Sequence, residues 1–388
     1  MNAFKRTVNV VNDWRHSLTT VFSRSITPVN SGQFPSARLS PKRSRTTDAK
    51  PGPVTGEAQK PRLSAIDLAR KVREKAKAPA TPPPSSTQQK RVQDLKRFST
   101  QLQSVHPNVL AKHLHRSLLY QDDHVVVINK PYGVALREDT GVTSICSVLP
   151  VLSKMMSGNK IKSDFQLLPC LGLEKEASGA LLLAKRAEVA ENIVNFQRNN
   201  QVQITYWVIT VGVPVPSEGV IDIPIIEREV TGPQPHYKMA LSPLFKMNDA
   251  GDGLTRVRAH RQAHSAVTRY KVLDSSCGCS LVELQPSTGV KHQMRVHMAF
   301  GLTCPILGDH KYSHWNKLAP QKLPERVLKK LGLEQSKSRH LPLHLHARRL
   351  TLPGAQRAGV SVRCPAPKYF TQTSTLLQLT LPLEEQQD

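Results

Sequence analysis

The feature that most constrains this chain is a series of seven strand-like apolar runs that follow His115. They are rich in Val, Ile, Leu and Thr, as strands are, whereas helical spacing after His115 is confined to residues 187–198 and 290–300. Several runs adjoin in sequence without an intervening helix, which favours antiparallel pairing. We therefore expect an α+β fold with a mixed, largely antiparallel sheet and flanking helices. The predicted strands are residues 125–128, 180–184, 202–213, 220–225, 268–273, 280–284 and 343–352.

The N-terminal part of the chain has a different composition. Residues 1–30 are basic, poor in acids and apolar at helical spacing, which indicates a mitochondrial targeting segment; a surface helix or a basic arm for nucleic acid is the alternative. Residues 31–90 are rich in Pro, Ser, Thr, Lys and Arg, and they hold too few large apolar side chains to form a core. We expect them to be a disordered basic linker. Residues 91–115 predict a helix that leads into a globular domain at residues 116–388.

The charge of the chain indicates a polyanionic partner. The 54 Lys and Arg exceed the 29 Asp and Glu by 25, far beyond what solubility requires. Residues 1–118 hold 22 basic and 6 acidic residues, so the remaining residues are also basic in total. The partner should therefore contact the globular domain as well as the N-terminal region.

Cysteine usage and hydropathy argue against several other classes of protein. The six cysteines lie mostly far apart, and the close pair Cys277 and Cys279 has neither metal-ligand nor redox-motif spacing, so free thiols in a reducing compartment fit best. His344 and His346 alternate as strand residues do, and we expect no metal site. No run of 18 apolar residues occurs, so we also expect no membrane-spanning helix.

A polar loop at residues 171–179 is the first candidate for chemistry. It carries Glu174, Lys175 and Glu176 and opens directly into the predicted strand 180–184. A carboxylate at the mouth of a buried strand can be desolvated and positioned, so Glu174 is a candidate catalytic residue. The alternative is that both glutamates are solvated turn residues beside Lys175.

Four segments occur in an order typical of one enzyme family. They are a strand at residues 122–133 that ends in Lys130 and a proline, the loop at 171–179, a long strand that begins with Thr205 and Tyr206, and residues 285–312. Together they resemble the RluA-type pseudouridine synthases, and most of all the vertebrate mitochondrial members that act on messenger RNA. The resemblance covers roughly residues 116–353, and the last segment is its most specific part. It implies an α+β catalytic domain with an RNA-binding cleft.

The resemblance implies that uridine is converted to pseudouridine within RNA, with no cofactor or metal. The target base is flipped out of the RNA, the glycosidic bond breaks, and the uracil turns over before a carbon–carbon bond forms. By resemblance, Glu174 attacks or stabilises the sugar, Arg295 pairs with that carboxylate, and Tyr206 faces the uracil. Taken singly, Arg295 and Tyr206 would each fit a structural role, and it is the joint order of the segments that favours a site.

The same segments supply the candidate RNA-binding residues, which are Lys130, Lys175, Lys291, His292 and Gln293. For Lys130 the alternative is support of the fold, and for His292 it is an ordinary helix histidine. The expected partner is messenger or ribosomal RNA in the mitochondrial matrix. RNA-granule or ribosome-assembly proteins are candidate further partners, and a monomer is the default.

The loop departs from the family pattern, which reads His-Arg-Leu-Asp where this chain has Leu171, Gly172, Leu173 and Glu174. Gly172 removes an arginine that helps to displace the base. Glu174 keeps the carboxylate but adds a methylene, which moves its oxygens by about 1 Å. Two hypotheses follow: an active synthase whose pocket accepts the longer carboxylate, and a weak or inactive relative that binds RNA, for example in ribosome assembly.

Overall fold

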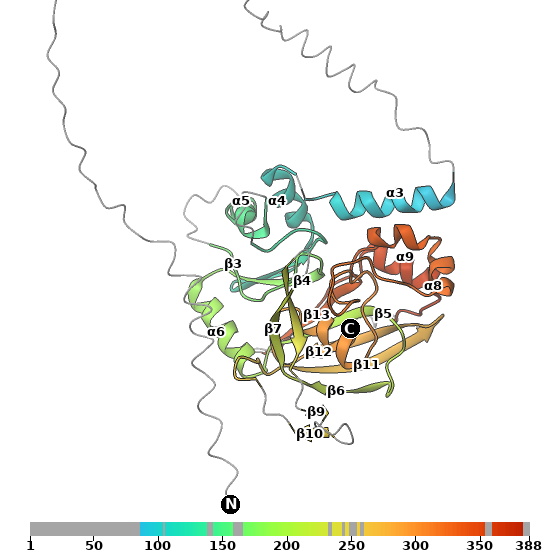
Figure 1. The fold of residues 1–388 in the computed structure, drawn as a ribbon. Coiled ribbons are helices and arrows are strands. Elements are labelled where there is room, and N and C mark those ends of the chain that lie inside the picture. The colour runs from blue at the N-terminus through green and yellow to red at the C-terminus, as the bar shows by residue number, and fades with distance from the viewer. Residues whose placement is uncertain are drawn as a thin grey trace, which may run out of the picture. The chain divides into compact units, whose positions relative to one another are not determined.

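A computed structural model describes residues 86–103, 105–137, 143–157, 166–231, 235–242, 245–247, 254–256, 260–353 and 359–382. The predicted targeting segment and residues 31–85 of the predicted linker lie outside these ranges, and both stay predictions. The fold of the described residues is drawn in Figure 1.

A mixed, largely antiparallel sheet forms the centre of the fold, as expected. Its main strand order is β1-β2-β4-β13-β5-β12-β11-β6, with β3 beside β4 and β14 beside β13. Every pair is antiparallel except β4 with β13, which run parallel. The strands are β1 Leu118–Gln121, β2 Val125–Lys130, β3 Leu168–Pro169, β4 Ser178–Ala184, β5 Gln203–Val211, β6 Glu218–Asp222, β11 Val267–Ser276, β12 Cys279–Pro286, β13 Leu345–Leu352 and β14 Val360–Arg363.

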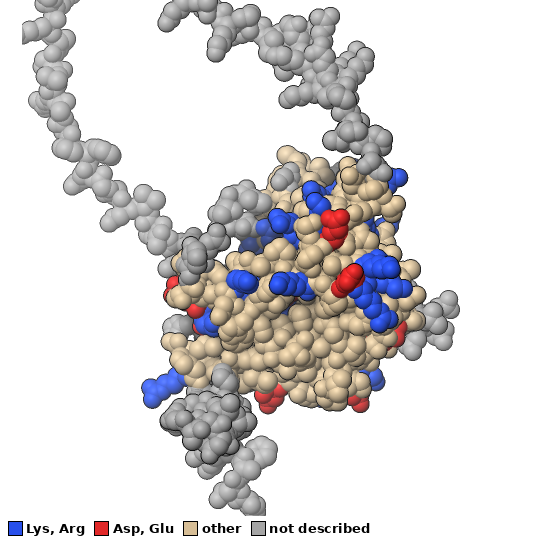
Figure 2. Space-filling view, turned by 45° about the vertical axis from the view of Figure 1, so that its right-hand side comes forward, with Lys and Arg blue, Asp and Glu red and all other residues tan. Residues whose placement is uncertain are grey.

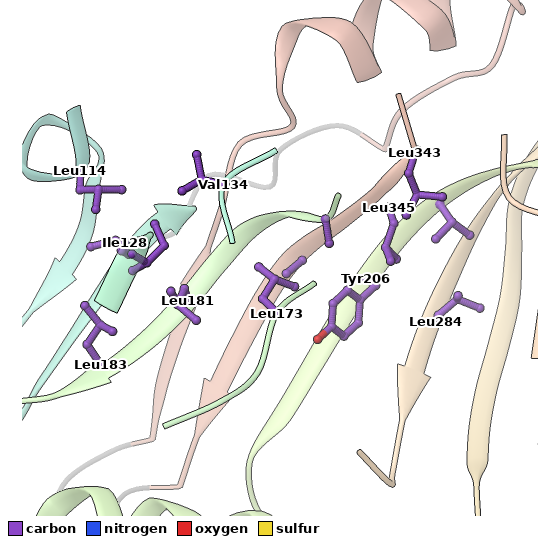
Figure 3. Packing of buried hydrophobic residues seen from close by; sticks show 14 of the residues in the cluster. Leu114, Ile128, Val134, Leu173, Leu181, Leu183, Tyr206, Leu284, Leu343 and Leu345 are labelled. Carbon is purple, nitrogen blue, oxygen red and sulfur yellow. The ribbon is translucent and has the colours of Figure 1, made fainter. Parts of the chain in front are cut away.

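Side chains alternate between two buried faces of this sheet, because successive strand residues point to opposite sides. On β5, Tyr206 and Val208 belong to one core cluster, whereas Trp207 and Ile209 belong to another. Figure 3 shows the first cluster, in which Tyr206 lies among leucines from several strands. Cover on both faces explains why β4 is buried along its whole length.

Helices cover both faces. On the Tyr206 face, α4 (Pro107–Arg116) and α5 (Ile145–Ser157) contribute buried residues to the same core cluster. On the opposite face, α6 (Ala187–Arg198) packs at one end of the sheet. The other end is covered by α3 (Thr87–Thr100), α8 (Glu325–Leu331) and α9 (Lys368–Leu376). Figure 1 shows α3 and α9 side by side.

The lead-in region differs from expectation in one respect. Residues 91–115 form parts of two helices, α3 and α4, rather than one. Pro107 is the cause, because it has no backbone N–H, and His106 before it is extended with ψ 141°. Leu110 and Leu114 of α4 are fully buried in the Tyr206-face core, so α4 is an integral part of the sheet's packing.

Two other predicted elements also break. The predicted strand 220–225 divides at Pro224: β6 joins the large sheet, and Ile225 starts β7 (Ile225–Val230), which pairs with β8 (His236–Leu241) in a separate hairpin. The strands β9 (Phe245–Met247) and β10 (Leu254–Arg256) form a second small sheet. The predicted helix 290–300 is shorter, with α7 (Gln293–Val296) continuing as a π-helical turn at His297–Gly301.

Three further observations concern the cysteines, membrane-spanning helices and metal sites. All six cysteines have free thiols. Within the described ranges, no helix is long and apolar enough to cross a membrane. The same residues contain no cluster of three or more His, Cys, Asp or Glu side chains arranged to hold a metal ion.

Candidate active site

Glu174 and Arg295 meet at one edge of the Tyr206 face, although they are 121 residues apart in sequence. Glu174 lies in the loop before β4, and Arg295 lies on α7, just after β12. Arg295 Nη1 donates to Glu174 Oε2 at 2.8 Å. The Arg295 side chain is 6% exposed and that of Glu174 is 22% exposed. The predicted pairing is therefore present, and its carboxylate side remains open to solvent.

Asp309 holds Arg295 from the opposite side. Its two oxygens accept from Arg295 Nε at 2.9 Å and Nη2 at 2.7 Å, a bidentate geometry that fixes the plane of the guanidinium. Asp309 is fully buried, and its Oδ1 also accepts from the backbone N–H groups of Lys311 and Tyr312. Arg295 is left with Nη1 aimed at Glu174.

A tight turn delivers Asp309 to this position. Gly308 has φ +82°, and a Cβ built there would lie 2.0 Å from the carbonyl oxygen of Pro342. Only glycine allows this close approach of two backbone segments. The site therefore depends on the Gly308 turn as well as on the charged residues.

Opposing effects set the ionisation of these three groups. Burial raises the pKa of Glu174, and Arg295 opposes that change. For Asp309, burial acts against ionisation, yet Arg295 and the backbone N–H groups keep its pKa below the usual value. Burial also disfavours the charged guanidinium, but Asp309 and Glu174 raise the pKa of Arg295 well above its usual value. A permanently charged arginine thus lies between one firmly ionised carboxylate and one that is easier to protonate.

Lys130 fixes the loop that carries Glu174. It is fully buried, and its Nζ donates to the carbonyl oxygens of Pro131, Lys175 and Ala177 at 3.1, 3.2 and 2.7 Å. Burial lowers the pKa of Lys130 to about 7, and the nearby Glu176 and Glu174 oppose the shift. These contacts are all internal, so the structure favours the alternative for Lys130, support of the fold, over RNA binding.

Tyr206 is buried at the start of β5 on the same face as Glu174. Burial raises its pKa, and Glu174 adds to the shift, which indicates that the carboxylate lies within electrostatic range of the hydroxyl. Within the described part of the chain, the Tyr206 hydroxyl has no hydrogen-bond partner. Figure 3 shows its oxygen pointing away from the β5 backbone. Tyr206 thus lies within electrostatic range of the carboxylate with its hydroxyl uncommitted, and its predicted role against the uracil stays a prediction.

Gln293 is a second predicted RNA-binding residue that is internal. It is 3% exposed. Its Nε2 donates to Val267 O and to Thr268 Oγ1, both at 2.9 Å. Its Oε1 accepts from Thr288 Oγ1 at 2.8 Å and from Val290 N at 3.1 Å. All four of its hydrogen-bonding positions are used, which favours a structural role over RNA binding: the residue ties α7 to β11.

The other candidate RNA-binding residues lie at or near the surface. Lys175 and Lys291 are exposed, and Lys291 Nζ contacts Glu227 Oε1 of β7 at 2.9 Å. His292 is half-buried, and its Nδ1 lies 2.6 Å from the Tyr312 hydroxyl. Gly172 is exposed, with no atom within 4 Å of the place where a Cβ would lie. Two exposed lysines thus lie in the segments that carry Glu174 and Arg295, and the position of the family's arginine is open space.

Comparison with known proteins identifies the family. Residues 124–300 match the sequence model described as RNA pseudouridylate synthase. The chain is 59% identical over 326 residues to the Danio rerio protein named mitochondrial pseudouridylate synthase RPUSD4, covering 83% of this chain and 90% of that protein. The chain belongs to the pseudouridylate synthase family. The family predicted from the four segments is thereby confirmed.

Two further relatives extend this result. The Mus musculus protein named mitochondrial mRNA pseudouridine synthase Rpusd3 is 32% identical over 292 residues, covering 70% of this chain and 80% of that protein. The solved structure of human RNA pseudouridylate synthase domain containing 4 is 49% identical and superposes with a TM-score of 0.64, covering 71% of this chain and 98% of that chain. The mixed sheet described above is thus a pseudouridine synthase fold.

Sequence reasoning missed two members of the site. Asp309 and Tyr312 appeared only as parts of the last segment, without a role. The available signal for Asp309 was its position: it directly follows a glycine, shortly after the predicted helix that carries Arg295. For Tyr312 no local pattern marks the contact with His292, since the two residues are brought together by the turn at Gly308.

Proposed function

We propose that this protein isomerises uridine to pseudouridine within RNA in the mitochondrial matrix, with Glu174, Arg295 and Tyr206 as its catalytic residues. The observation that carries the proposal is the 2.8 Å contact between Glu174 and a buried arginine that Asp309 fixes in place. Membership of the pseudouridylate synthase family and the mitochondrial names of the relatives support it.

Each residue has a physical role in the reaction. The ionised Glu174 carboxylate attacks or stabilises C1′ of the ribose as the bond to uracil breaks. Arg295 favours the ionised form against the effect of burial, and it costs little reorganisation because Asp309 already holds it. Tyr206 offers a flat ring against the turned uracil and a protonated hydroxyl, since burial and Glu174 raise its pKa.

RNA binding would rest on the basic surface around this site. Lys175, which follows Glu174 in its loop, and Lys291, four residues before Arg295, are exposed and are the candidates to contact phosphates around an everted nucleotide. Figure 2 shows that Lys and Arg outnumber Asp and Glu on the face drawn. Because these contacts release counterions, affinity for RNA should fall steeply with salt. Messenger or ribosomal RNA is the substrate class, and RNA-granule or ribosome-assembly proteins are candidate partners of a monomer.

The test is pseudouridine mapping of mitochondrial RNA in cells that lack the protein, rescued with wild type or with Glu174→Gln. Glutamine keeps the size of Glu174 and one acceptor oxygen for Arg295 but cannot ionise, so we expect wild type alone to restore the lost sites. Purified proteins assayed on a transcript that contains one such site should show the same difference. Restoration by both versions, or the absence of any dependent site, contradicts the proposal.

A second function is favoured by one observation, the open space at Gly172. Without an arginine there, the protein could bind RNA but displace the base poorly, and act as an RNA-binding assembly factor. Gly172→Arg separates the two, because the position has room for the side chain and no positive φ. A slow synthase should become faster with this variant, whereas a protein that only binds RNA should gain affinity without forming pseudouridine.

A further inference from the structure

His292 occupies an unusual position that the reaction proposed above does not use. It is the residue before α7, and it has φ +56° and ψ 20°, in the left-handed region that few residues other than glycine adopt. Such a conformation persists only where the surroundings impose it, and it gathers at functional sites. The conformation therefore suggests a functional role for the His292 side chain.

Tyr312 determines which nitrogen of His292 carries the proton. The Met239 backbone N–H donates to the Tyr312 hydroxyl oxygen at 3.3 Å. The hydroxyl proton is therefore available to His292 Nδ1, which lies 2.6 Å away. Burial raises the pKa of Tyr312, so its proton stays in place. A neutral imidazole that accepts at Nδ1 must carry its own proton on Nε2.

That nitrogen lies near Glu174, although beyond hydrogen-bond distance. The distance from His292 Nε2 to Glu174 Oε2 is 3.9 Å, and the same oxygen accepts from Arg295 Nη1. Among the described residues, no hydrogen bond or ion pair reaches Glu174 Oε1. One donor thus binds Oε2, a second lies close to the same oxygen, and Oε1 is left available. Hydrogen bonds in a site without substrate are often long and shorten when the complex forms.

We propose that His292 is a positioning residue: with Arg295 it holds Glu174 Oε2 through an Nε2–H that Tyr312 orients, so that Oε1 faces the ribose. The proposal rests on the proposed function and adds a residue to it. Burial, followed by Arg295, lowers the pKa of His292 to about 3, which keeps the imidazole neutral. The charged and titratable groups around it are Glu174, Lys291, Arg295, Asp309, Lys311, Tyr312 and, further away on β8, Lys238.

The main test is His292→Asn. Asparagine tolerates the left-handed conformation, but its amide is too short to reach Glu174, so the backbone is kept and the contact is lost. We expect the single-turnover rate at saturating RNA to fall about tenfold, with the dissociation constant for RNA unchanged. The acid limb of the pH–rate profile should move to higher pH, because the ionised Glu174 carboxylate loses a hydrogen-bond donor and its pKa rises. His115→Asn, at an exposed position on α4, is the matched control.

Tyr312→Phe is the second variant, in case the first fails to fold. It keeps the ring 5.1 Å from the Arg295 guanidinium carbon but removes the hydroxyl that sets the tautomer. We expect a smaller fall in rate, again with unchanged RNA affinity. A wild-type rate and acid limb in both folded variants overturns the proposal. Weaker RNA binding at an unchanged rate does so too, and restores the RNA-binding interpretation of His292.

An observation that does not depend on activity completes the test. In protein labelled with ¹⁵N-histidine, the signals that disappear in His292→Asn belong to His292, and their shifts report the tautomer. We expect the neutral Nε2–H form at pH 6 to 8, and a mixture in Tyr312→Phe. A charged ring or an Nδ1–H form overturns the proposal. If wild type forms no pseudouridine, the proposed function fails, and the NMR result still decides the orientation of His292.

Discussion

At the scale of single residues, the site is a row of three charged side chains whose burial increases from Glu174 to Asp309. Glu174 is partly exposed, Arg295 is nearly buried, and Asp309 is fully buried. The buried pair of Arg295 and Asp309 contributes more to the geometry of the site than to stability. The attraction between two buried charges offsets little more than the free energy needed to remove them from water. Its value is that the guanidinium cannot rotate away when the base enters and leaves.

Asp309→Asn tests this arrangement. An amide has one acceptor oxygen and cannot accept from both N–H groups of Arg295. The guanidinium should therefore tilt, and its contact with Glu174 should be distorted. We expect the single-turnover rate to fall on the order of a hundredfold, and the free energy of unfolding to fall by about 3 kcal/mol, as measured by denaturant titration. Asp123→Asn, at an exposed position, should change neither. An unaltered rate with reduced stability would show that Asp309 serves the fold alone.

At the scale of elements, the sequence predicted most of the fold and the central pairing of the site. Strand-like apolar runs predicted β2, β4, β5, β11 and β12, because much of the sheet is covered on both faces. The helix 187–198 was predicted with the bounds that the structure shows. The predictions failed where a single residue interrupts an element that the surrounding pattern predicts. Pro224 ends a predicted strand, and the left-handed backbone of His292 makes α7 begin later than predicted.

The roles of buried polar residues could not be predicted for the same reason. Lys130 and Gln293 look like surface residues in sequence, since lysine and glutamine are rarely buried. Their burial depends on acceptors that come from elsewhere, such as the carbonyls of Lys175 and Val267. No local pattern carries that information. Tyr206 and Arg295 were found only because their segments resemble a family, whereas Glu174 was also indicated by its place in a polar loop before a buried strand.

Gln293→Leu tests the structural role of Gln293 at this scale. Leucine has a similar volume but leaves Val267 O, Thr288 Oγ1 and Val290 N without their partner. We expect the free energy of unfolding to fall by about 2–4 kcal/mol, measured by denaturant titration, and RNA affinity to be kept at temperatures where the variant is folded. Gln285→Leu, at an exposed position on β12, is the control. Wild-type stability combined with weak RNA binding would contradict this view.

At the scale of the whole molecule, buried neutral histidines make stability depend on pH. Burial lowers the pKa of His344 and His346 to about 4, and that of His292 to about 3, from 6.5. Between pH 6.5 and about 4 the unfolded chain binds protons at these positions and the folded protein does not. The unfolded state is therefore favoured as pH falls through this window, and stability rises with pH.

We expect the free energy of unfolding to drop steeply below pH 6.5. Each such histidine contributes up to about 1.4 kcal/mol per pH unit, measured by urea titration between pH 7.5 and 5. His346→Gln removes one of the groups and should flatten the dependence, even if the variant is less stable at pH 7.5. A dependence as steep as that of wild type would show that other groups dominate acid unfolding.

The position of β13 has a consequence for how the protein is made. This strand lies between β4 and β5, yet it is the last but one to leave the ribosome. Gly179 of β4 packs closely against Ala347 of β13. A Cβ at position 179 would lie 2.4 Å from the Ala347 carbonyl oxygen, so a larger residue does not fit between these two strands. Nascent chains that end before residue 345 lack the strand that joins β4 to β5, and the edges of these two strands stay unpaired until β13 is made.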